Sequence, residues 1–246
     1  MSIIIGSEFC SNKFGMFKIV DYCGNNKFLI EFDVTGYRSV EYRSNILKGN
    51  VKDYLQPTVY GFGVSGKKYD KTDNSGKFLK QYDLWQGMIR RCYSNNKPKS
   101  YENCSVSDYF KYYCNFYDWC NEQVGFKVHG FEIDKDLLMK GNKEYHENLC
   151  VFIPNEINTF LTNRRNHRGI YPIGVKKKSK NESYQSSISK KGKIHHLGYF
   201  KTPEEAFYAY KEAKEDYAKE LANKWKDEID PRAFDALVNY EVNIND

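Results

Sequence analysis

The chain has 246 residues, of which 28% are charged and 40% hydrophobic, and its formal net charge is +6 at pH 7. This length allows two or three small domains with buried cores. No run approaches about 18 apolar residues, which excludes a membrane-spanning helix, and the apolar residues after Met1 are too few for a secretion signal. The odd cysteine count, seven, together with no such signal, predicts reduced thiols and a cytoplasmic location.

Residues 1–66 alternate like short strands. Apolar side chains recur at every second position around Phe17 and Phe28, and turn residues occupy 24–26 and 35–37. Short strands joined by tight turns predict a small β-barrel-like domain. We expect this domain to bind a protein partner, with a second nucleic-acid contact as the alternative.

The middle segment, residues 79–163, begins with two helical patterns. Residues 79–93 and 108–124 carry apolar and aromatic side chains at helical spacing, and this aromatic stripe is interpreted as core. The cysteines of this segment include no C-x-x-C pair, so zinc is unlikely as a bound metal.

Residues 131–158 carry the most chemically informative pattern. An apolar strand ends in Asp134, a polar loop follows, a second strand begins after Asn148, and a helix then carries Asn155 and Asn158. This order resembles the HNH (ββα-metal) nuclease motif, in which a hairpin holds one divalent metal against a helix. The resemblance implies that Asp134 is a carboxylate ligand, that Asn158 or Asn155 is an amide ligand, and that Asn148 pins the loop. Such oxygen ligands suit Mg²⁺ or Mn²⁺.

The residue after Asp134 departs from that motif. HNH proteins place a general-base histidine there, whereas this chain has Lys135, which is protonated near neutral pH and is a better phosphate partner than base. His146 and His129 are alternative bases. The expected catalytic set is Asp134, Lys135, His146 and Asn148, and the expected metal set is Asp134, Asp136 and Asn158. The other interpretation is a degenerate nuclease fold that serves as a DNA-binding or structural scaffold.

Residues 164–201 are strongly basic. They hold eleven Lys or Arg residues and one acid, Glu182, which gives +10 and leaves about −4 for the rest of the chain. Three strand patterns fall in this segment, and Gly192 between two lysines indicates a tight hairpin turn. Thr202 then opens a helix with a capping box that is closed by Glu205.

The motifs Gly174-Val175, Tyr184-Gln-Ser-Ser-Ile188, Leu197-Gly-Tyr-Phe200 and Glu204-Glu-Ala206 resemble the Apetala-type (ethylene-response-factor-like) DNA-binding domain. Such domains lay a three-stranded sheet in the major groove of duplex DNA. With the preceding arginines, the implied DNA contacts are Arg164, Arg165, Arg168, Lys176, Lys178, Gln185, Ser187, Lys190, Lys193 and His195. The strands lack the family's dense arginine and tryptophan readers, which favours affinity for phosphate over discrimination between bases.

The order of these parts resembles phage homing endonucleases of the HNH class. It predicts an α+β fold with a small β-rich domain at 1–66, an HNH-like domain with flanking helices at 79–163, an Apetala-type domain at 168–225, and a short helix with an acidic tail at 226–246. The expected function is hydrolysis of phosphodiester bonds in duplex DNA with Mg²⁺ or Mn²⁺, in the host cytoplasm if a phage encodes the chain. The alternative is a catalytically inactive DNA-binding protein, either a regulator or a phage factor that blocks a host enzyme.

Overall fold

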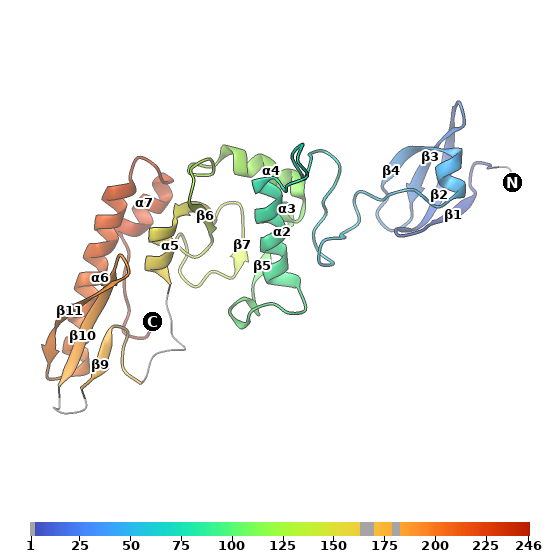
Figure 1. Ribbon diagram of the computed structural model, residues 1–246. Coiled ribbons are helices and arrows are strands. Elements are labelled where there is room, and N and C mark those ends of the chain that lie inside the picture. The colour runs from blue at the N-terminus through green and yellow to red at the C-terminus, as the bar shows by residue number, and fades with distance from the viewer. Residues whose placement is uncertain (1–2, 163–169, 179–182) are drawn as a thin grey trace. The chain divides into compact units, whose positions relative to one another are not determined.

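A computed structural model of the chain describes residues 3–162, 170–178 and 183–246. These residues form a mixed α+β fold with several small sheets, none of which closes into a barrel within the described ranges (Figure 1). The chain divides into two compact units, Met1–Asp118 and Trp119–Asp246. The division falls inside the segment 79–163 that the sequence predicts as one domain.

The first unit begins with an open antiparallel sheet of four strands in the order β1-β2-β3-β4. The strands and the helix after them are β1 (Glu8–Ser11), β2 (Gly15–Gly24), β3 (Lys27–Phe32), β4 (Arg38–Tyr42) and α1 (Arg43–Leu47). Phe17 of β2 and Ile30 and Phe32 of β3 lie at alternate strand positions, are at most 1% exposed, and form the core with Ile46 of α1. The predicted strands are confirmed, but the barrel-like closure is wrong because β1 and β4 remain separate edges.

The remaining elements of this unit are α2 (Lys80–Tyr93), the 3₁₀ turn η1 (Lys99–Tyr101), β5 (Ser105–Val106), α3 (Asp108–Lys111) and α4 (Tyr113–Glu122), which crosses into the second unit. The aromatic stripe is core, as predicted, since Phe110 and Phe116 are fully buried. The single helix expected over 108–124 is interrupted at Tyr112, which is extended. The interruption has a tertiary cause, because Val64 bonds to the backbone on both sides of Tyr112, through Lys111 O and Tyr113 N.

The second unit contains a small ββα arrangement. Its elements are β6 (Phe131–Asp134), β7 (Glu144–Tyr145), β8 (Val151–Pro154) and α5 (Asn155–Leu161). Strands β6 and β8 pair antiparallel, from Phe131 opposite Pro154 to Asp134 opposite Val151. The apolar run of β8 is wholly buried, which fixes the hairpin against α5.

The same unit ends with a three-stranded antiparallel sheet and two helices (Figure 1). These are β9 (Val175–Lys177), β10 (Tyr184–Lys190), β11 (Lys193–Phe200), α6 (Pro203–Trp225) and α7 (Pro231–Val238). The central strand is β10, and α6 packs along one face of the sheet. The predicted capping box is confirmed, because Thr202 Oγ1 accepts from Glu205 N and the Glu205 carboxylate accepts from Thr202 N.

Lys191 and Gly192 form the two-residue turn between β10 and β11. Their φ angles are 53° and 74°, as a type I′ turn requires. Lysine is strained at positive φ, whereas asparagine adopts this conformation readily. We therefore expect Lys191→Asn to raise the free energy of unfolding by about 0.5 kcal/mol, measured by urea denaturation. Lys191→Val should lower it, and equal stability of the two variants would contradict this account of the turn.

The acidic C-terminal segment is held against α6. Val242 is 3% exposed, its N–H donates to Glu215 Oε1 at 2.9 Å, and its carbonyl accepts from Lys211 Nζ at 3.0 Å. These residues therefore complete the packing of the second unit.

No disulfide joins any two of the seven cysteines, all of which lie in described parts of the chain. Among the helices that the structure describes, none is both long and apolar enough to cross a membrane.

Candidate nucleic-acid interface

The β9–β11 sheet has one face under α6 and one open face. Val175 and Ser186 lie on the covered face and are 8% and 0% exposed. Because side chains alternate along a strand, their neighbours Lys176 and Gln185 lie on the open face. The register places Lys176 opposite Gln185, and Gln185 opposite Tyr199, in one row across all three strands.

Tyr199 lies at the centre of the contacts on this open face. Lys178 Nζ donates to Tyr199 Oη at 2.8 Å and lies 4.5 Å from the ring centroid. The His196 ring is 4.5 Å from the Tyr199 ring, and Ile194, further along β11, is 78% exposed. The open face thus combines ammonium, amide and aromatic groups, which are the kinds of group that contact phosphates and bases.

Three of the predicted DNA contacts lie in the row that faces α6. Lys190 is opposite Lys193, and His195 is opposite Ile188, which is 2% exposed. Lys190 Nζ is 3.1 Å from Glu220 Oε1 on α6. The expectation that these residues share one surface with Lys176 is therefore corrected, because strand alternation turns them to the other side.

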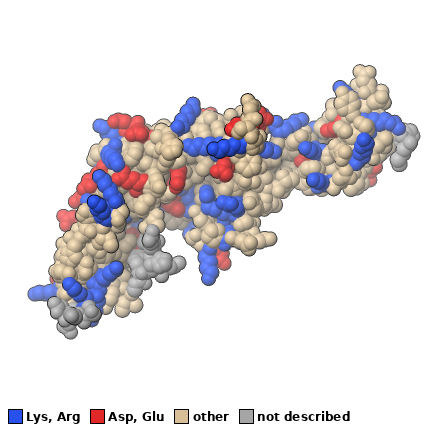
Figure 2. Space-filling view, viewed as in Figure 1, with Lys and Arg blue, Asp and Glu red and all other residues tan. Residues whose placement is uncertain are grey.

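Four of the predicted contacts do lie on the open face, namely Lys176, Lys178, Gln185 and Ser187. Arg164, Arg165 and Arg168 lie outside the described residues. Figure 2 shows lysine and arginine side chains gathered near the lower end of the β9–β11 sheet, whereas basic and acidic side chains are interspersed along α6.

Asp134 ends β6 and stabilises the loop that follows it. Its Oδ1 accepts the backbone N–H groups of Asp136 at 2.9 Å and Leu137 at 2.7 Å. The carboxyl is 8% exposed, and this burial raises its pKa, while the two backbone hydrogen bonds oppose the increase. Asp134 therefore has a complete structural role in turning the chain out of β6.

Lys135 is also buried, at 6% exposed, and ties the same loop together. Its Nζ donates to Asn142 O at 2.9 Å and to Asp136 Oδ1 at 2.6 Å. In return, Asn142 Nδ2 donates to Lys135 O and Glu144 O, each at 2.7 Å. Asn142 thus performs the loop-pinning role that the sequence assigned to Asn148.

The other predicted catalytic residues make local contacts. His146 Nδ1 accepts the backbone N–H of Asn148 at 3.1 Å, and Asn148 O accepts from Arg232 at 3.0 Å. His129, the second candidate base, is exposed in the segment before β6. These contacts explain the shape of the chain around His146 and do not direct its ring to Asp134.

The predicted metal ligands do not assemble one oxygen shell. Asp134 Oδ1 accepts two backbone N–H groups, Asp136 faces the Lys135 ammonium, and Asn158 Nδ2 donates to Glu132 Oε2 at 2.7 Å. No group of three His, Cys, Asp or Glu side chains in the described part of the chain is arranged to hold a metal ion. Mg²⁺ binds proteins through one or two carboxylates, with waters and substrate phosphates completing its shell, and Asp134 and Asp136 are here the carboxylates that also hold the loop together.

Sequence reasoning missed Tyr199, His196 and Ile194 as parts of the open face. Their alternation along β11 is obscured by a register shift between Ser186 and Ser187 of the partner strand. Asn142 was also missed, although it follows Gly141 in a turn-favouring pair.

Comparison of the chain with protein-family models, with curated proteins and with solved structures gives no match.

Proposed function

We propose that the chain binds duplex DNA through the open face of the β9–β11 sheet. The observation that carries this proposal is the uncovered row of Lys176, Gln185 and Tyr199, with Lys178 resting on the tyrosine ring. Ammonium groups contact phosphates, and a glutamine amide can pair with a base edge. A small β-sheet or ribbon of this width fits the major groove of B-form DNA.

Binding through this face depends mainly on phosphate contacts. Lysine offers a point charge without the paired donors of arginine, and Gln185 is the one side-chain amide in the described row. We therefore infer a protein that tolerates many sequences and whose affinity falls steeply with salt. In this proposal the hairpin of β6 and β8, together with α5, serves as a structural scaffold. The burial of Lys135 in the loop after β6 agrees with that role.

The double substitution Lys176→Gln/Lys178→Gln tests this proposal. Each lost phosphate contact should make the dependence of log K on log salt less steep by about one, so the slope should fall by about two. The affinity for a labelled duplex at about 50 mM salt should fall by about tenfold or more. Fluorescence anisotropy over a salt series measures both quantities.

Lys190→Gln is the matched control, because Lys190 carries the same charge on the same sheet but pairs with Glu220. Its duplex affinity should stay within about twofold of that of the unmodified chain. Equal losses in the control and in the double variant would show that the open face is not the binding surface.

A metal-dependent nuclease is the second candidate, and the order hairpin then helix in β6, β8 and α5 favours it. Incubation of supercoiled plasmid with Mg²⁺ or Mn²⁺ separates the two proposals. If β6, β8 and α5 form only a structural scaffold, the plasmid should stay supercoiled in the presence of either metal. Metal-dependent nicking that is lost in Asn158→Ala, a change at a half-buried helix position, would make the nuclease the better proposal.

A further inference from the structure

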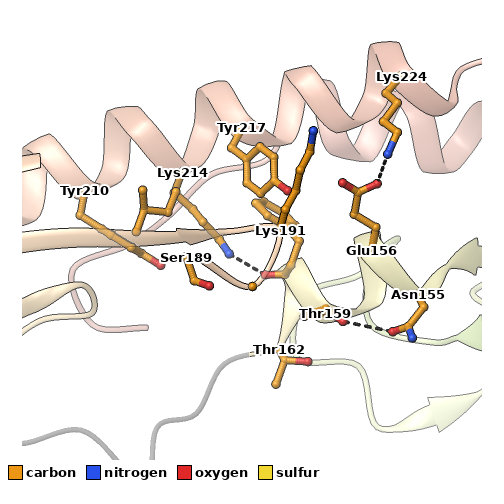
Figure 3. Close-up of a pocket in the computed structure, with 13 residues that line it drawn as sticks. Asn155, Glu156, Thr159, Thr162, Ser189, Lys191, Tyr210, Lys214, Tyr217 and Lys224 are labelled. Atoms are coloured by element: carbon orange, nitrogen blue, oxygen red, sulfur yellow. Dashed lines mark hydrogen bonds and ion pairs between the residues drawn. The ribbon is translucent and has the colours of Figure 1, made fainter. Parts of the chain in front are cut away.

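A pocket of about 620 Å³ lies between α5, the β10–β11 turn and α6 (Figure 3). Lys191 and Ser189 line it from the hairpin, and Lys214 and Tyr217 line it from α6. Ser189 is in the same alternating row of β10 as Gln185. Ile188, on the face of β10 that α6 covers, also lines the pocket, so the pocket lies at the turn end of the sheet, on its α6 side.

Lys214 is the central cation of this pocket. Its Nζ donates to Phe160 O at 2.5 Å and lies 3.7 Å from the Phe160 ring centroid. An ammonium has three N–H donors, so this bond leaves two more for a bound group. Burial lowers the pKa of Lys214 to about 8, so most of the molecules carry its charge at pH 7.

The pocket has more positive than negative charge. Glu156 is the single acid in its lining, and that carboxylate already accepts from Lys224 (Figure 3). It also accepts from Trp225 Nε1 at 3.1 Å. Lys214 thus has no carboxylate partner from the described lining, whereas Lys191 interacts electrostatically with Glu156. The Tyr217 hydroxyl is buried and lies close to the backbone of Lys191, without a hydrogen bond of good geometry to any described residue.

We propose that this pocket binds a phosphate group, held by the ammonium groups of Lys214 and Lys191 and by the hydroxyl of Tyr217. The combination fits an oxyanion, because three lysines, one acid and a buried hydroxyl line one partly desolvated space, which leaves an excess of positive charge. The phosphate has two possible sources. The first source is a nucleic acid bound to the open face, and this alternative rests on the proposed function. The second source is free phosphate or a nucleotide.

The direct test measures the pKa of Lys214 with and without inorganic phosphate. NMR of its side-chain ε-methylene in the full chain reports this pKa during a pH titration. A bound anion favours the protonated amine, so the pKa should rise from about 8 by about one unit. Lys191→Asn, which suits the turn, should weaken phosphate binding by about fivefold or more. Lys219→Met, which removes an exposed cation of α6 outside the pocket, should leave it unchanged.

Stability gives a second readout. The pKa of Lys214 is lower in the folded chain, about 8, than its ordinary value of 10.5, so between these values the unfolded chain binds more protons and stability rises with pH. Phosphate should reduce that rise, because it restores the charged form. Lys214→Met should remove both the rise and its response to phosphate.

A short oligonucleotide with and without a 5′-phosphate distinguishes the two sources. A Lys214 pKa that rises with inorganic phosphate in both the unmodified chain and the Lys176→Gln/Lys178→Gln variant supports the pocket, whatever the outcome for DNA binding. A rise that needs the oligonucleotide and is lost in that variant assigns the phosphate to bound nucleic acid. A pKa that stays near 8 with inorganic phosphate and with both oligonucleotides overturns the proposal and leaves the open face untouched.

Discussion

Replacing Asp134 with alanine should lower the free energy of unfolding of the second unit by about 2–3 kcal/mol. The carboxylate accepts two backbone hydrogen bonds, from Asp136 and Leu137, and their N–H groups would lose their acceptor in a buried turn. The gain from no longer burying a carboxylate offsets part of the loss. Hydrogen exchange of these two amides measures the effect locally, and both should exchange about 30-fold faster or more.

Two variants control this prediction. Asp134→Asn keeps an oxygen acceptor at the same position and should cost less than alanine. Asp136→Ala removes the carboxylate partner of the buried Lys135 ammonium and should also cost stability, but it keeps the Asp134 acceptor, so the amides of residues 136 and 137 should stay more protected than in Asp134→Ala. If Asp134→Ala left both stability and amide exchange unchanged, a structural role would be wrong, since a carboxylate kept only for a metal is dispensable for folding.

The sequence predicted those elements whose signals are local. The Lys191-Gly192 turn and the Thr202–Glu205 capping box depend on residues within four positions of one another, and both occur as expected. The interruption at Tyr112 depends instead on Val64, almost fifty positions away, and no pattern within the helix indicates it. Local chemistry was therefore readable, and distant pairing was not.

The DNA-contact set shows where counting charge misled the sequence argument. Tyr184, Ser186 and Ile188 already alternated as one row, and Lys190 is the next member of that row. The pattern itself therefore placed Lys190 beside Ile188, under α6. The predicted contact set included Lys190 because of its charge and ignored its position in the alternation. Lys190 was therefore assigned to the open face, whereas it faces α6.

For residues 131–158, the order of the elements could be predicted but the side-chain contacts could not. The order of strand, loop, strand and helix agrees with the structure, but the partners of Lys135 do not follow from spacing. Its ammonium reaches Asn142, seven residues along, only because the intervening loop closes on itself. Residue types can thus indicate a site whose atoms the fold uses for other contacts.

The lysines of the second unit accordingly fall into three groups. Lys135 is buried within its own loop, and Lys190 and Lys224 pair with acids on neighbouring elements. Only the remaining cations, such as Lys176 and Lys214, are open to an anionic partner. Counting every lysine of the second unit therefore overstates the charge available for binding, and both proposals concern the smaller remaining set.

Gly174→Ala should be the most damaging single substitution in the β9–β11 sheet. Gly174 has φ +79°, and an added Cβ would lie 2.1 Å from Tyr210 Cδ2 and 2.3 Å from Cγ. Left-handed strain costs about 1–2 kcal/mol and overpacking a further 1–3 kcal/mol, so we expect a loss of about 3 kcal/mol in the free energy of unfolding. Urea denaturation of the full chain measures it.

Gly192→Ala separates the two causes, because Gly192 has nearly the same φ, +74°, and no atom within 4 Å of an added Cβ. It should cost only the strain, about 1 kcal/mol.

Gly174 O also accepts from Ser187 N at 3.0 Å, so displacing Gly174 should loosen β9 and the lysines it carries. Duplex affinity should then fall together with stability. In a Tyr210→Ala background, Gly174→Ala should cost less than in the unmodified chain, because the ring that the new methyl group would strike is absent. Equal costs at Gly174 and Gly192 would mean that β9 does not pack on Tyr210 as closely as described.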